Sequence, residues 1–239
     1  GALLDGLTNF TDMIPYQRIL VVGTLGFNTK HFGVMNNLVV KSDGSFTIRM
    51  NSPTVTSLTG AKIHASELII DVGGVFEIVG AASLYVNILN VSGTLKATGG
   101  HSPLGIEYPS CTSWCKRVGA AHGGTGGTNN GGQTIPHPGF TSVYGSATYP
   151  IDVGSNGGGG AIRVVASSMV QLGHQGILST DGGTSRASGG SGSGGSVLVI
   201  APKIISHGRI SANGAIYCGS DGSVGLGCGG GGRIALHSD

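Results

Sequence analysis

The sequence predicts an all-β fold, a right-handed parallel β-helix in which short strands stack as the coils of a solenoid. Two repeated motifs predict it. The first motif is five consecutive residues: a glycine, any residue, an apolar residue, any residue, and a small or apolar residue. Its five copies place their apolar residue at Phe46, Phe76, Leu95, Leu178 and Ile210. Self-similarity at intervals of about 20 to 40 residues is typical of solenoids, and crossovers between parallel strands are nearly always right-handed.

The second motif is a glycine block that opens onto a short apolar strand. It occurs at residues 159–166, 194–201 and 231–237. Alternate residues of a strand point to opposite faces, so the apolar residues of both motifs should stack like on like inside the solenoid. The glycines should supply the positive φ angles that tight corners require.

The continuous repeat predicts one domain over residues 1–239, divided into four parts. Residues 1–37 are the least patterned and are expected to form an N-terminal cap or linker. Residues 38–100 should form tight coils, 101–156 an inserted loop, and 157–239 glycine-rich coils. No part shows the sustained 3.6-residue apolar period of a helix.

Composition narrows the class of protein. Glycine supplies 47 of 239 residues, and charged residues only 10% against the usual quarter or so. A net charge of +2 without a basic cluster argues against a nucleic-acid partner, and no apolar run has the length of a membrane span. The chain starts at Gly1 and shows no signal peptide, so we expect a processed protein or a segment of a longer one.

The cysteines and two sequons point to an extracellular protein. Two close cysteine pairs predict small disulfide loops and an oxidising compartment. A four-cysteine zinc site is the less favoured alternative, since neither pair has the two-residue gap usual for zinc. The cysteine pairs are Cys111 with Cys115 and Cys218 with Cys228, and the glycosylation sequons start at Asn9 and Asn90.

The ionisable residues do not form a catalytic pattern. His174 and His207 each precede the glycine of a repeat copy and should stack on one ridge. We favour two histidines stacked on successive turns and exposed to solvent over a metal ion shared between them. Asp181 aligns with Asn213 rather than with another acid, whereas sugar hydrolysis needs paired carboxylates. We therefore expect no enzyme, no cofactor and no metal.

Some strands of the glycine-rich region are apolar on both faces. An apolar outer face has to be covered, either by the 101–156 insertion or by a neighbouring subunit. The outward residues, which form the candidate assembly face, are Val165, Leu198 and Ile200. The insertion also holds the aromatic residues that are candidate glycan contacts, Trp114, Tyr144 and Tyr149.

Three further features carry a resemblance. They are the run Gly93–Gly100, two glycine blocks that lead into strands (157–160 into 162–166, and 194–195 into 197–201), and the closing segment 229–237. Through them the chain resembles glycine-rich extracellular or cell-surface proteins of plants and protists with predicted parallel β-helix repeats. The shared motifs are architectural, so the resemblance implies a fold and a location but no functional residue.

The expected function is structural. The chain is predicted to be a subunit of an extracellular fibre, coat or appendage that self-assembles through the ends or faces of the β-helix. Its main partner would be another copy of itself. The first alternative is a glycan-binding adhesin module, and the second is a polysaccharide-active β-helix enzyme.

Overall fold

The computed structural model describes residues 16–28, 31–49, 60–99, 122–123, 145–154, 158–183, 191–215 and 228–238. All the regular structure in these residues is β-strand, arranged in two sheets. The eight-stranded sheet contains β1 (Tyr16–Val21), β3 (His31–Val40), β5 (Ala61–Ile70), β7 (Ala81–Val91), β9 (Ala161–Leu172), β11 (Ser196–Ile200), β12 (Lys203–Ser206) and β14 (Arg233–His237). The six-stranded sheet contains β2 (Thr24–Asn28), β4 (Ser45–Arg49), β6 (Val75–Val79), β8 (Thr94–Thr98), β10 (Ile177–Ser179) and β13 (Arg209–Ser211).

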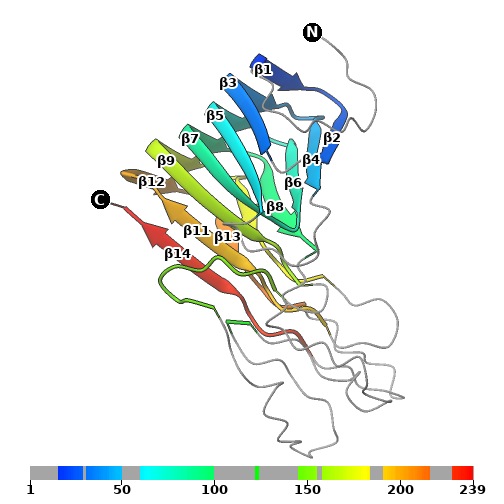
Figure 1. Cartoon of the computed structure of the whole chain (residues 1–239), viewed down its shortest axis with the longest axis vertical. Helices are drawn as coiled ribbons and strands as arrows, with labels where there is room; N and C mark the ends of the chain where they lie inside the picture. Colours follow the sequence, from blue (N-terminus) through cyan, green and yellow to red (C-terminus); the bar gives the residue numbers. More distant parts are fainter. Residues whose placement is uncertain are drawn as a thin grey trace, which may run out of the picture.

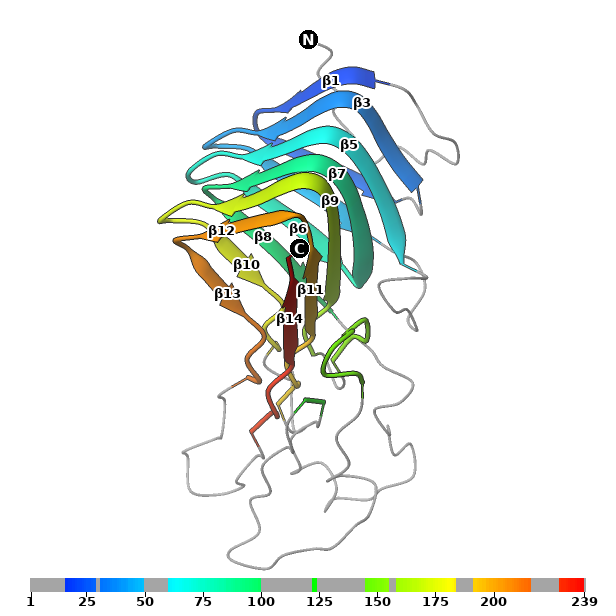
Figure 2. The ribbon, with the colours of Figure 1, turned by 90° about the vertical axis from the view of Figure 1, so that its left-hand side faces the viewer.

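Both sheets stack their strands in chain order. The orders are β1-β3-β5-β7-β9-β11-β14, with β12 beside β9, and β2-β4-β6-β8-β10-β13. Every strand pair is parallel. The chain alternates between the sheets, except that β11 and β12 follow each other in the eight-stranded sheet. Figure 1 shows the strands of the eight-stranded sheet side by side from the N-terminal end, and Figure 2 shows its long strands bending across the molecule.

Apolar side chains form continuous columns between the sheets, as the sequence predicts. Phe46 pairs with Phe76, Phe76 with Leu95, Leu95 with Leu178 and Leu178 with Ile210. The first four are fully buried, and the rings of Phe46 and Phe76 meet edge to face at 4.8 Å between centroids. The expected stacking of like on like is therefore confirmed.

The glycines that close the motif have the expected positive φ, at 102° for Gly80 and 72° for Gly99, whereas the glycines that open it have a different role. We call one strand of each sheet, together with the turn that joins them, a rung. A Cβ on Gly74 would lie 2.7 Å from the backbone oxygen of Lys41 in the previous rung, and a Cβ on Gly93 would collide with the backbone oxygen of Asp71. Neither residue has a positive φ; Gly73, just before the motif, does, at 82°. These glycines are needed because one turn packs directly on the backbone of the next, which leaves no room for a side chain.

The predicted right-handed parallel β-helix is wrong. The described strands form two parallel sheets, and no closed solenoid is found in the part of the chain that the structure describes. The returns from the six-stranded sheet to the eight-stranded sheet differ greatly in length: residues 29–30, 50–60, Gly80 alone, 99–160, 180–195 and 212–232. Strands pair in a ladder only where successive rungs follow the same course, and the described residues of these unequal returns add no third sheet to the two.

Parts of the predicted insertion lie against the outer side of the eight-stranded sheet. Val153 packs with Ala81 and Ala161 in a small apolar cluster. Farther along, the amide of Gly123 donates to the carbonyl oxygen of Gly231 at 2.8 Å, just before β14. The described residues of the insertion are therefore packed on the strands. That residues 1–239 form one domain stays a prediction.

No described segment forms a helix with the length and apolar character to cross a membrane.

Candidate functional site

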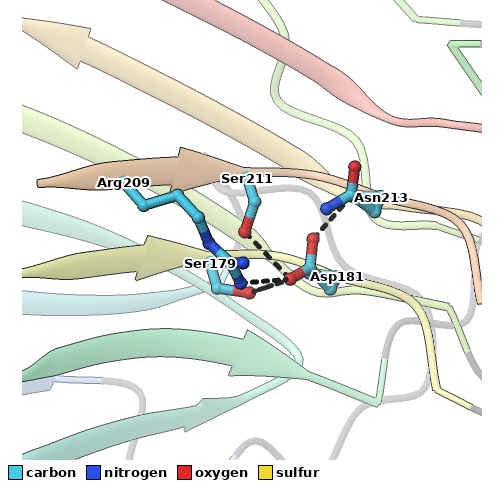
Figure 3. Close-up of polar contacts among 5 residues, drawn as sticks. All are labelled: Ser179, Asp181, Arg209, Ser211 and Asn213. Atoms are coloured by element: carbon cyan, nitrogen blue, oxygen red, sulfur yellow. Dashed lines mark hydrogen bonds and ion pairs between the residues drawn. The ribbon is translucent and has the colours of Figure 1, made fainter.

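A carboxylate holds together the last two rungs of the six-stranded sheet (Figure 3). Asp181 follows β10, and its Oδ2 accepts hydrogen bonds from the hydroxyls of Ser179 at 2.8 Å and Ser211 at 2.9 Å. Its Oδ1 accepts the backbone N–H of Asn213 at 2.6 Å. The guanidinium of Arg209 lies 3.7 Å from Oδ2, with the arginine side chain 65% exposed.

This cluster, which we call the Asp181 clamp, is suited to stability rather than catalysis. Both carboxylate oxygens are occupied by donors from this chain, so neither is poised to take a proton from a substrate. No group of three or more metal-binding side chains occurs among the described residues. The alignment of Asp181 with Asn213 that the sequence predicts is confirmed, because Gly182 also donates its amide to the carbonyl of Asn213.

A second polar cluster lies on the outer face of the eight-stranded sheet. Arg163 on β9 donates from Nε to the hydroxyl of Tyr149 at 3.1 Å and from Nη1 to the hydroxyl of Tyr85 at 3.0 Å. Its guanidinium carbon also lies 5.6 Å and 5.9 Å from the centroids of the Tyr85 and Tyr149 rings, within cation–π range. Two strands and the insertion thus orient one guanidinium.

The strand register explains why these residues meet. On the neighbouring strands β7 and β9, Ser83 lies opposite Arg163 and Tyr85 lies opposite Val165. Alternate residues of a strand share a face, so Arg163 and Tyr85 lie diagonally opposite each other on the outer face of the sheet. The turn at 146–149, in which the Tyr149 amide donates to the Ser146 hydroxyl at 2.9 Å, brings Tyr149 over the row that contains Arg163.

Further polar and aromatic side chains continue this face. The ring of His64 on β5 stacks on that of Tyr85, with centroids 4.8 Å apart and planes within 10°. One row farther on, Asn87 donates to the Ser66 hydroxyl at 3.2 Å and accepts from the Ser167 hydroxyl at 2.8 Å. His64 and Asn87 are exposed. We define the Arg163 surface as Lys62, His64, Tyr85, Asn87, Tyr149 and Arg163.

Among the described residues, no acidic side chain neutralises the charge of the Arg163 surface. Within the part of the chain that the structure describes, no carboxylate forms an ion pair with Lys62 or Arg163. Glu67, on the same strand as Lys62, accepts a hydrogen bond from Asn37 at 2.9 Å. Asp152 lies beside His122, where its charge favours the protonated imidazole.

His122 belongs to the insertion and anchors it in the interior of the protein. It is fully buried, and its Nδ1–H donates to the carbonyl oxygen of Gly194 at 2.7 Å. A Cβ on Gly145 would lie 3.2 Å from His122 Nε2 and 3.0 Å from an Asp152 carboxylate oxygen, so both groups converge on that glycine. Burial lowers the pKa of His122 below its ordinary value of 6.5, although the Gly194 hydrogen bond and Asp152 act in the opposite direction.

The predicted histidine ridge is present. The rings of His174 and His207 stack with centroids 4.9 Å apart and planes 24° from parallel. Both residues are exposed. In stacked rings the nitrogen lone pairs lie in nearly parallel planes and do not converge on one ion, so this pair is not arranged as a metal site.

The structure places only some of the predicted site residues. Cys228 is disulfide-bonded, and Asn90 is half-buried on β7, opposite Ile69 and Gln171. Tyr149, a candidate glycan contact, is 38% exposed and holds Arg163. The other disulfide, glycosylation and glycan-contact predictions fall on residues outside those described: Asn9, Cys111, Trp114, Cys115, Tyr144 and Cys218. Their roles, including the cysteine pairing and glycosylation at Asn90, stay predictions.

The residues of the candidate assembly face differ in exposure, and whether they contact a neighbouring subunit stays a prediction. Leu198 is 0% exposed, so it offers nothing to a neighbouring subunit. Val165 and Ile200 are half-buried. The insertion reaches this part of the sheet, since Nε2 of His237, opposite Ile200, hydrogen-bonds the carbonyl oxygen of Thr148 at 2.6 Å.

Sequence reasoning missed Arg163 and Tyr85. The sequence did contain one signal for Arg163: it is a charged residue at an outward position in the middle of an otherwise apolar strand. Its partner row could not be deduced, because the unpatterned stretch 99–160 separates β8 from β9 and conceals the register between β7 and β9.

Comparison of the chain with protein-family models, with curated proteins and with solved structures finds no match in any of the three. The resemblance to glycine-rich extracellular proteins therefore stays a prediction.

Proposed function

We propose that this protein is a structural subunit of an extracellular fibre, coat or appendage, and that copies of it join end to end. The observation that carries the proposal is the exposure of apolar side chains at the two ends of the stacked strands. The apolar columns are buried in the middle but half-exposed in the terminal rungs, at Ile19, Leu25, Ile204 and Ile210.

The end that carries β14 exposes two apolar side chains. Ile234 pairs with Val197 and Leu236 with Val199, so both continue buried columns. They are nevertheless 42% and 47% exposed, because no further described rung covers them. A strand edge with apolar side chains is a template for pairing with another strand.

A second copy fits this end by geometry. One end of the stack presents the edges of β14 and β13, and the other presents those of β1 and β2, all in parallel sheets. Placing β1 of one copy beside β14 of another would continue the eight-stranded sheet, and β2 could then follow β13. Such a head-to-tail contact uses two different surfaces and extends into a filament unless it closes into a ring.

The proposed location outside the cell has independent support. Cys228 is disulfide-bonded, and such bonds persist mainly in oxidising compartments. The low charge of the chain, 10% of residues, also suits close packing between subunits.

Sedimentation velocity over a concentration series, with negative-stain electron microscopy, tests the proposal. We expect the 239-residue chain to form linear oligomers that grow with concentration. Ile234→Lys combined with Leu236→Lys should abolish them, because two ammonium groups would have to be buried at the joint.

Val72→Lys is the matched control. Val72 is 50% exposed in the turn between β5 and β6, away from the end strands, so this variant should assemble normally. Circular dichroism would confirm that all variants remain folded. A wild-type chain that stays monomeric at every concentration, or end variants that still form filaments, would contradict the proposal.

A further inference from the structure

We propose that the Arg163 surface binds an acidic polysaccharide and that Arg163 recognises the carboxylate groups of its sugars. This inference does not depend on the assembly proposed above, because the Arg163 surface lies on interior strands rather than at the ends of the stack.

The first argument is the way in which Arg163 is held. A guanidinium has five N–H donors, and two of them are used on the neutral hydroxyls of Tyr85 and Tyr149. These bonds fix the orientation of the group without cancelling its charge. The remaining donors at the end of the guanidinium match the planar, bidentate geometry of a carboxylate.

The second argument is the aromatic platform beside that charge. His64 and Tyr85 stack in parallel on the strands, and Tyr149 is 38% exposed. Aromatic rings of this kind present an apolar face together with a polar edge. A pyranose ring has a matching apolar face of C–H groups, while its hydroxyls stay hydrated or find polar partners.

The third argument is the supply of partners for those hydroxyls. The amide of Asn87 lies in an exposed row with Ser66 and Ser167. Amides and hydroxyls both donate and accept hydrogen bonds, as sugar hydroxyls do. The row runs beside the aromatic platform, so one ligand can contact both.

The fourth argument concerns the length of the ligand. Lys62 pairs with Ser83, and Ser83 pairs with Arg163, so the two cations occupy equivalent positions two strands apart. With adjacent strands about 4.8 Å apart, their Cα atoms lie about 10 Å from each other. Two separated cations along the stacking direction favour a chain that carries repeated acidic groups over a single small anion.

Two other acidic partners fit less well. Peptides commonly bind sheets by adding a strand at an open edge, but β5, β7 and β9 are all paired on both sides. Nucleic acids bind to concentrated basic patches, and the net charge of this chain is only +2.

The experiment is isothermal titration of the 239-residue chain with polygalacturonate at low salt. We expect binding to polygalacturonate and none to its fully methyl-esterified form, which lacks the charges. Arg163→Gln should weaken binding at least about tenfold, because a charged hydrogen-bonding partner is lost. Tyr85→Phe keeps the ring but removes one hydroxyl that orients Arg163, so it should cause a smaller loss.

Lys203→Gln is the matched control. Lys203 is an exposed residue of β12, outside the Arg163 surface, and its loss removes the same single charge. It should leave the affinity unchanged, and thermal melts should show all variants folded. The proposal is overturned if polygalacturonate does not bind or if Lys203→Gln weakens binding as much as Arg163→Gln. Equal binding of the methyl ester, or of polyglutamate, would also overturn it.

Discussion

The carboxylate of Asp181 accepts the backbone N–H of Asn213 at 2.6 Å, across two successive rungs of the six-stranded sheet. The contact is reinforced by the hydroxyl of Ser211, so one side chain satisfies donors on the neighbouring rung from both its oxygens. Where each rung contacts only its neighbours, these hydrogen bonds directly stabilise the pairing of the last rung with the one before it.

Replacement of this carboxylate should weaken the C-terminal part of the stack. We expect Asp181→Ala to lower the free energy of unfolding by about 1.5–3 kcal/mol, the usual contribution of hydrogen bonds to a charged group. Asp181→Asn should cost less, since it retains one acceptor oxygen. Urea unfolding measures both, and Asp43→Ala, at an exposed turn residue, is the control that should change little.

The close packing of the turns predicts a sharp difference between two glycines. Gly93→Ala should destabilise the protein by about 1–3 kcal/mol, because the new methyl group collides with the backbone oxygens of Asp71 and Gly74. Gly231→Ala should be neutral, since nothing lies within 4 Å of its Cβ position. Thermal melts of the two variants would refute the packing argument if they moved together.

His122 should make stability depend on pH. Because the pKa of His122 is lowered in the folded protein, the unfolded chain binds more protons as pH falls below the ordinary value of 6.5. The contribution of the neutral, buried imidazole is therefore complete above pH 6.5 and declines below it. Urea midpoints measured between pH 5 and pH 8 should show this decline.

The variant His122→Asn isolates that effect. The asparagine amide can still donate to the Gly194 carbonyl in place of Nδ1, but it does not titrate. The decline in stability below pH 6.5 should therefore be smaller in this variant. An unchanged pH profile would mean that other groups cause the decline.

The local repeat was the predictable part of this fold. Glycine spacing and alternation were sufficient to predict that Phe46, Phe76 and Leu95 stack, and that His174 stacks on His207. Both follow from parallel pairing of equivalent positions, which a repeated sequence encodes directly.

The remaining features depend on the connections, which the repeat does not encode. The expectation of a right-handed parallel β-helix failed because the described strands form two parallel sheets, joined by returns of very unequal length. The role of Gly93 was misjudged because the repeat gives its position but not the distance to the previous turn. The Arg163 surface and the burial of Leu198 involve the insertion, whose course has no repeated pattern.

The long return between β8 and β9 also has a consequence for how the chain acquires its structure. Rungs from β3 to β8 are linked by short connections and can form early, as a self-contained seed, while the later part is still being synthesised. The register of β9 on β7 must then be found after closure of a large loop, whose entropic cost precedes any gain from pairing. We therefore expect docking of the C-terminal half onto the seed to be the slow step of folding, and an unfinished seed would expose the edges of β7 and β8 to other chains.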